Sequence, residues 1–153
     1  MVREGEQHAD NDRKKREMVE TKIDLRPALD DGFGSVMVWV RPVIQPPDNE
    51  YYEDVRVTWV QRTQLAVDAI MDGETVYALV TSLQTGLPVD GADVSLQPEG
   101  MQAKSGAAGI AELALPESHG QGRWLVASKD KDVVFLPENV YWNGGSSWVK
   151  STK

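Results

Sequence analysis

The amino-acid sequence predicts an all-β protein built as an antiparallel β-sandwich, with additional strands N-terminal to it. Apolar side chains recur at every second position in several short runs, which is the period of a half-buried strand. Turn residues separate these runs at intervals of roughly 8–12 residues, as they do in sandwich folds. Outside the charged N-terminus, no run of ordinary helix length shows the 3.6-residue period of an amphipathic helix.

The stretch at residues 75–96 shows the pattern most clearly, because two alternating runs flank a corner. Pro88 lacks a backbone donor, so this corner cannot lie in the middle of a sheet. Asp90-Gly91 is a turn dipeptide, since glycine accepts a positive φ without steric cost. Alternation resumes at residues 92–96. Two strands joined in this way are typical of immunoglobulin-like and fibronectin-III-like sandwiches.

Strands are also predicted N-terminal to this stretch. Residues 23–28 alternate up to a proline, and a turn cluster follows at residues 30–34. Residues 35–41 (S-V-M-V-W-V-R) carry bulky side chains on both faces. We therefore expect this strand to lie inside a sheet or to be covered on both sides. Residues 54–61 form another alternating run.

The passage from residues 54–61 to the next strand, at residues 64–70, contains neither glycine nor proline. Such a direct passage suits a chain that leaves one domain and enters the next. Asp72-Gly73 then predicts a hairpin turn. Later strands are predicted at residues 108–115, 123–129 and 133–136, with a loop or ragged edge strand at 97–107, and an aromatic, glycine-rich loop at 141–148.

These patterns divide the chain into segments. Residues 1–21 form a charged, flexible segment, in which acidic neighbours cancel the basic run at 13–16. Residues 22–62 contain too few strands to fold alone, so they either join the sandwich that follows or complete or adjoin a neighbouring one. Residues 63–140 form the sandwich itself. Residues 141–153 link it to a following domain.

Composition excludes several classes of function. The chain has 153 residues, 41% of them hydrophobic, and a formal net charge of −8. This charge argues against a nucleic-acid partner, which requires clustered lysine and arginine. No apolar run is long enough for direct membrane insertion. The absence of cysteine excludes disulfides and thiolate metal sites within this chain.

We predict no catalytic, cofactor-binding or metal-binding residue. His8 and His119 both lie in polar stretches, without a second group to hold them in a dry cleft. Asp90 and Asp93 flank the corner, but turn chemistry explains them and calcium-loop spacing is absent. The serines lack a nucleophile-elbow context, and the glycines lack a helix start behind them. The sequence therefore favours a protein that is not an enzyme.

Tyr141, Trp142 and Trp148 are the candidate contact residues. Their rings could stack on a glycan or a peptide. Alternatively, they pack the C-terminal linker against an adjoining domain, which their position at the domain exit favours.

Three stretches together resemble the macroglobulin-like domains of bacterial alpha-2-macroglobulins. They are V-Y-A-L-V-T-S-L-Q-T-G-L-P-V-D-G-A-D-V-S-L (76–96), A-A-G-I-A-E-L (107–113) and W-L-V-A-S-K-D-K-D-V-V-F-L (124–136). The preceding V-T-W-V-Q-R-T-Q-L-A-V-D-A (57–69) looks like a passage between consecutive domains of those proteins. The resemblance covers about residues 22–142, and residues 1–22 depart from it.

The resemblance implies a role as a structural scaffold in a large, exported protease inhibitor, which traps endopeptidases. Members of that family present a bait region, and many carry a thioester formed between cysteine and glutamine. Neither can be located in this chain, which has no cysteine. The implied partners are neighbouring domains of the same polypeptide and, through the whole protein, target proteases. The implied location is the periplasm or the cell surface.

The chain begins with a charged run and no apolar leader, so it is either cytoplasmic or a piece of something longer, and the second is expected. A second hypothesis is a stand-alone immunoglobulin-like surface module that binds glycan or peptide through the aromatic residues at 141–148. Loss of such a ligand on Trp142→Ala is the discriminating result.

Overall fold

The structure, a computed structural model, describes residues 22–41, 55–115, 122–138 and 148. The chain forms two compact units, Met1–Val60 and Gln61–Lys153. Among the described residues, no helix is long and apolar enough to cross a membrane.

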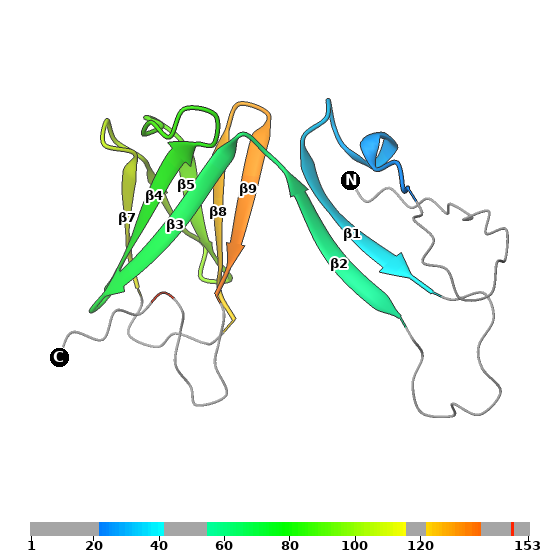
Figure 1. The fold of residues 1–153 in the computed structure, drawn as a ribbon. Coiled ribbons are helices and arrows are strands. Elements are labelled where there is room, and N and C mark those ends of the chain that lie inside the picture. Colours follow the sequence, from blue (N-terminus) through cyan, green and yellow to red (C-terminus); the bar gives the residue numbers. More distant parts are fainter. Residues whose placement is uncertain (1–21, 42–54, 116–121, 139–147, 149–153) are drawn as a thin grey trace, which may run out of the picture. The chain divides into compact units, whose positions relative to one another are not determined.

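In the first unit, the short 3-10 helix η1 (Arg26–Ala28) precedes strand β1 (Gly34–Val40). Strand β2 (Arg56–Arg62) pairs with β1 in a two-stranded sheet and runs across the boundary between the units. Figure 1 shows both strands and the helix that precedes them.

The strand predicted at residues 23–28 is wrong, because helix η1 occupies its second half. Asp24 explains the change: its carboxylate accepts hydrogen bonds from the backbone N–H of Arg26 at 3.0 Å and from the Arg26 guanidinium at 2.6 Å. A side chain that bonds the backbone two residues later favours a turn over an extended strand. Pro27 fits the first turn of a helix, where its missing donor is not needed.

The turn predicted at residues 30–34 is confirmed. Asp30 and Phe33 exchange two backbone hydrogen bonds, of 2.9 and 2.8 Å. Asp31 and Gly32 between them have φ values of 47° and 84°. Positive φ at both central residues is the geometry of tight hairpin turns.

Strand β1 is not in the interior of a sheet among the described residues, and the coverage of residues 35–41 on both sides stays a prediction. Strand β1 has β2 as its one neighbour among the described residues. Met37 and Trp39 remain 52% and 55% exposed, and Val57 of β2 is 51% exposed. Alternation predicted the strand correctly, but it gave no information on whether a second layer covers it.

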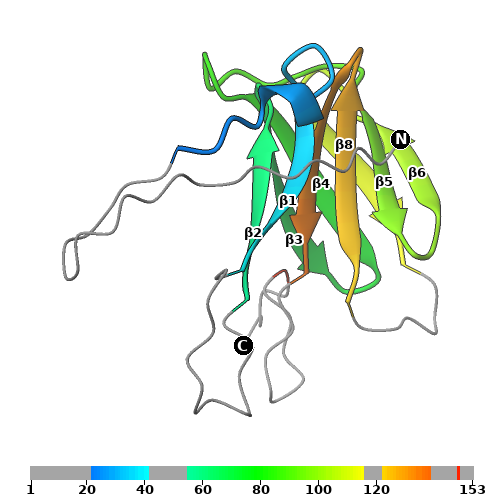
Figure 2. The same cartoon turned by 90° about the vertical axis from the view of Figure 1, so that its right-hand side faces the viewer.

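The second unit is an antiparallel sandwich of two sheets, which confirms the predicted all-β immunoglobulin-like or fibronectin-III-like class. Its strands are β3 (Leu65–Asp72), β4 (Thr75–Ser82), β5 (Asp93–Gln97), β6 (Met101–Lys104), β7 (Ile110–Ala114), β8 (Trp124–Lys129) and β9 (Asp132–Pro137). One sheet has the order β3-β4-β7, and the other has the order β6-β5-β8-β9. Figures 1 and 2 show the two layers from perpendicular directions.

The connections follow the predicted turns. Asp72 pairs with Thr75 across a two-residue turn in which Gly73 has a φ of 58°. The chain then crosses from β4 to the second sheet, returns from β6 to β7, and crosses again to β8. Strand β6 lies at the edge of its sheet, so the ragged edge strand expected within residues 97–107 is present.

The corner between β4 and β5 is held by backbone and side-chain hydrogen bonds. Pro88 forms an isolated bridge with Thr81. The buried Ser105 hydroxyl donates to the carbonyl of Val89 at 2.7 Å and accepts from the N–H of Ala92 at 2.9 Å. Gly91 has a φ of 66°, as the turn dipeptide predicted. The corner therefore satisfies its own buried polar groups without joining a sheet interior.

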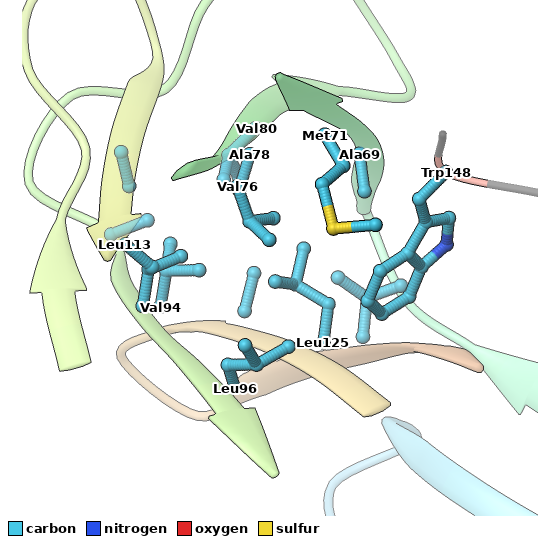
Figure 3. Close-up of a cluster of buried hydrophobic side chains, with 14 of the residues drawn as sticks. Ala69, Met71, Val76, Ala78, Val80, Val94, Leu96, Leu113, Leu125 and Trp148 are labelled. Atoms are coloured by element: carbon cyan, nitrogen blue, oxygen red, sulfur yellow. The ribbon is translucent and has the colours of Figure 1, made fainter. Parts of the chain in front are cut away.

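The core lies between the two sheets and is filled by the predicted alternate positions. Val76, Ala78 and Val80 of β4 are fully buried. They face residues such as Val94, Leu96 and Leu125 from the opposite sheet, as Figure 3 shows. The burial of alternate residues on both sheets fixes the register of pairing, because a slip by one residue would turn every apolar side chain outward.

Candidate functional site

The candidate site is a cluster of buried charged side chains at one end of the sandwich, which we call the basal ion cluster: Glu99, Arg123 and Glu138. Glu99 lies in the turn between β5 and β6, Arg123 immediately precedes β8, and Glu138 immediately follows β9. All three side chains are at least nine-tenths buried. Charged residues at such burial are rare unless they are paired, so the cluster is the most unusual chemistry in the described residues.

Arg123 is the centre of the cluster. Its Nε atom lies 3.4 Å from Oε2 of Glu138 and 3.7 Å from Oε1 of Glu99. Its Nη1 donates to the sulfur of Met71 at 3.5 Å. The backbone reinforces the contact with Glu138, because the N–H of Glu138 donates to the carbonyl of Arg123 at 2.8 Å. The Arg123 side chain, at the start of β8, thus contacts β3 of the other sheet, the turn between β5 and β6, and the end of β9.

Two carboxylates share one guanidinium in this cluster. Both oxygens of Glu99 are buried without a hydrogen-bond partner, so its compensation is the ion pair with Arg123. Burial removes the water that would otherwise hydrate the Glu99 carboxylate. A single ion pair offsets only part of that desolvation free energy. Both carboxylates are ion-paired with the Arg123 guanidinium, which stays protonated and cannot act as a base. Its chemistry is that of a structural clamp.

The sequence contained a signal for the cluster that our sequence reasoning missed. Arg123 has the same parity as Leu125 and Ala127, which are buried in β8. Glu138 likewise continues the inward-facing positions of β9. A charged residue at an inward position of an alternating strand predicts a buried ion pair, because an unpaired charge there would be too costly.

Trp148, one of the predicted contact residues, is packed in the core. It is 4% exposed, and its carbonyl accepts a hydrogen bond from the N–H of Met71 at 2.7 Å. Figure 3 shows its indole beside the Met71 side chain, which is itself a partner of Arg123. Trp148 is therefore not free to stack on a ligand, and the linker predicted at 141–153 includes a residue of this sandwich.

Tyr141 and Trp142 lie outside the described residues, so a contact through their rings stays a prediction. His8 and His119 also lie outside them. Asp93 is engaged in a salt bridge with Lys104, and Lys129 donates to the carbonyl of Asp90 at 2.9 Å. Within the described part of the chain, no group of three or more histidine, cysteine, aspartate or glutamate side chains could hold a metal ion.

A second set of polar contacts fastens the segment that leads into β3. The side-chain amide of Gln61 donates to the carbonyl of Phe135 and accepts from its N–H, both at 2.8 Å. The N–H of Gln64 donates to the Asp132 carboxylate at 2.7 Å. Both partners belong to β9, so the start of the unit is tied to the outer strand of the second sheet.

No protein-family model matches this chain, and no curated protein is significantly similar to it. Among solved structures, it is similar to native alpha-2-macroglobulin from Escherichia coli, in a crystal structure spanning domains MG0-NIE-MG1. The TM-score is 0.56 at 23% identity, over 74% of this chain and 35% of that one. The chain thus spans about a third of the length of the structure it matches, and the likeness concerns the fold.

Proposed function

We propose that this chain is a scaffold segment of a large, exported protease inhibitor of the alpha-2-macroglobulin type, without catalytic activity of its own. The observation that carries the proposal is the two-stranded sheet of the first unit, whose apolar side chains Met37, Trp39 and Val57 are exposed. An isolated two-stranded sheet is marginally stable at best, and its apolar face needs a second layer. A neighbouring domain of the same polypeptide would supply that layer.

The passage into the sandwich supports this proposal. Only Thr63 and Gln64 separate β2 from β3. Gln61 and Gln64, at the start of the second unit, both form hydrogen bonds with β9 of that unit. A connection of two residues between consecutive strands is what adjoining domains of one scaffold polypeptide would use.

The match to a solved fragment of alpha-2-macroglobulin, which spans several domains, agrees with a multi-domain scaffold and with a periplasmic or extracellular location. The basal ion cluster fits the same role. Its ion pairs join the turn between β5 and β6, the start of β8 and the end of β9. Target proteases would contact the whole protein rather than this segment.

The test uses the protein encoded by the complete reading frame, purified and mixed with an endopeptidase. Trapping predicts that the protease keeps its activity on a small peptide substrate but loses activity on a folded protein substrate, because its active site remains intact inside the trap. The core variant Val94→Asp in the whole protein should abolish this protection, and the exposed variant Gln102→Ala should not. Retained digestion of the protein substrate by the mixture would contradict the proposal.

Hydrogen exchange provides a separate test of the scaffold role. The amides of β1 should exchange quickly in the isolated 153-residue chain and slowly in the whole protein, because a covering domain raises their protection. Equal exchange in the two would show that no neighbouring domain covers β1.

A further inference from the structure

The outer face of the sheet β3-β4-β7 carries an exposed apolar centre. Ile70, Leu79 and Ile110 are 43%, 40% and 43% exposed. Leu79 lies directly opposite Ile110, and Ile70 lies directly opposite the half-buried Tyr77. The four side chains are thus neighbours on three adjacent strands, and they line a groove of about 340 Å³.

Carboxylates surround this centre. Asp68 lies opposite Leu79, Glu112 lies opposite Tyr77, and Asp72 lines the groove beside Ile70. All three are exposed, and none of them forms a salt bridge with any residue that the structure describes. Alternation places no lysine or arginine on the outward face of β3, β4 or β7. We call this surface the acidic-rimmed face.

The outer face of the other sheet is built differently. Its exposed Asp93 is neutralised by Lys104 on the neighbouring strand β6. The positions beside this pair are the polar residues Ser95 and Gln102. One sheet thus has its exposed aspartate paired with a lysine. The other sheet has three carboxylates without a salt bridge around an apolar groove, and this surface is suited to a positively charged partner.

We propose that the acidic-rimmed face docks a protein surface that presents an aliphatic centre ringed by lysine or arginine. The apolar groove provides the area that is favourable to remove from water, and the unpaired carboxylates provide the charge complementarity. A nucleic acid is excluded because its phosphates would meet the carboxylates. A second copy docked face to face is disfavoured for the same reason, since it would bring like charges together. The proposal does not depend on the function proposed above.

The test uses the isotope-labelled 153-residue chain and a short helical peptide with a leucine face flanked by lysines. Titration followed by NMR should give saturable shifts at the amides of Ile70, Leu79 and Ile110, weakened by added salt because rim charges are screened. A peptide with glutamate in place of each lysine serves as the control and should not bind. Absence of saturable shifts on this face, or larger shifts on the opposite sheet, would overturn the proposal.

Variants separate the rim from the centre. The double variant Asp68→Lys/Glu112→Lys should bind the lysine peptide at least about tenfold more weakly, because each change turns an attraction into a repulsion. The matched double variant Asp90→Lys/Asp93→Lys makes the same change in net charge elsewhere and should bind almost as the parent does. Leu79→Ser should also weaken binding, and its melting temperature shows that it remains folded. Equal loss in both double variants would mean that net charge alone attracts the peptide, which would overturn the proposal.

Self-association is the competing occupant, and sedimentation measures it directly. The proposal expects a monomer at the concentrations of the titration. A dimer that Leu79→Ser dissociates would assign the acidic-rimmed face to a second copy instead.

Discussion

Strands β1 and β4 have nearly the same alternating pattern of apolar residues, yet their surroundings differ completely. In β4, Val76, Ala78 and Val80 are fully buried, whereas no residue of β1 is buried. The difference is that β4 lies in a sheet with a second sheet packed over it, and β1 lies in a two-stranded sheet. Alternation therefore reports that a strand has an apolar face, and the rest of the fold decides whether anything covers that face.

The substitution expected to change the free energy of unfolding most is one that buries a charge in the core. Val94→Asp should destabilise the sandwich by about 3 kcal/mol or more, because it places an unpaired carboxylate in the core. Val57→Asp, on the exposed face of β2, should change the free energy of unfolding by no more than about 0.5 kcal/mol. Denaturant unfolding of both variants measures the contrast. A large loss for Val57→Asp would show that its face is already covered in this chain.

The next effect compares a buried arginine with an exposed one. Arg123→Ala should cost about 3–5 kcal/mol, because it leaves Glu99 and Glu138 buried without their cation. Arg26→Ala removes an exposed salt bridge with Asp24 and should have little effect on unfolding. The melting temperatures of the two variants, measured at neutral pH, check this. Similar small shifts would mean that the basal ion cluster opens to water at no cost.

Two glycines have nearly the same backbone conformation but differ in how closely other atoms pack around them. Gly86 and Gly109 have φ values of 71° and 74°. A Cβ at Gly86 would meet no atom within 4 Å, but one at Gly109 would lie 2.5 Å from the carbonyl oxygen of Val80. Gly86→Ala should cost about 1 kcal/mol from positive φ alone, and Gly109→Ala should cost clearly more because a backbone atom must move. Equal unfolding midpoints for the two variants would contradict the packing at Gly109.

The smallest effect is a titration in the first unit. Hydrogen bonds from the Arg26 side chain and backbone lower the pKa of Asp24 from 3.8 to about 2. A lowered pKa in the folded state means that the contribution to stability is present above pH 3.8 and is lost as the pH falls toward 2. NMR titration of the Asp24 carboxyl should give this midpoint, and Arg26→Ala should return it toward 3.8. An unchanged midpoint in the variant would assign the shift to another group.

Most of the sandwich could be predicted from the sequence because local signals and burial agree there. Alternation at 75–82 and 92–97, and the turns Asp72-Gly73 and Asp90-Gly91, all reappear in the structure. Helix η1 was missed because a single side chain, Asp24, overrides the extended pattern. The domain boundaries at 62 and 140 stay predictions, although Trp148 packs with the sandwich.

The candidate site was harder to predict than the fold. The alternation of β8 predicts that the Arg123 side chain points into the core. Its partner Glu99 lies in a turn, where alternation does not predict the direction of a side chain. The acidic-rimmed face needed the pairing of the β3–β4 hairpin with β7, which is distant in sequence, since Glu112 and Asp68 lie beside the same apolar centre only through β4. Such placements depend on topology, which a single sequence specifies only through long-range packing.

The contact between Gln61 and β9 has a consequence for aggregation. An unprotected edge strand is a template on which another chain can add a strand, and this is a common start of polymerisation. At Phe135, the backbone groups that would recruit such a strand are already bonded to the Gln61 amide. The Gln61 side chain therefore occupies the backbone hydrogen-bonding groups of one residue of β9, and its removal would take away that local protection against strand addition.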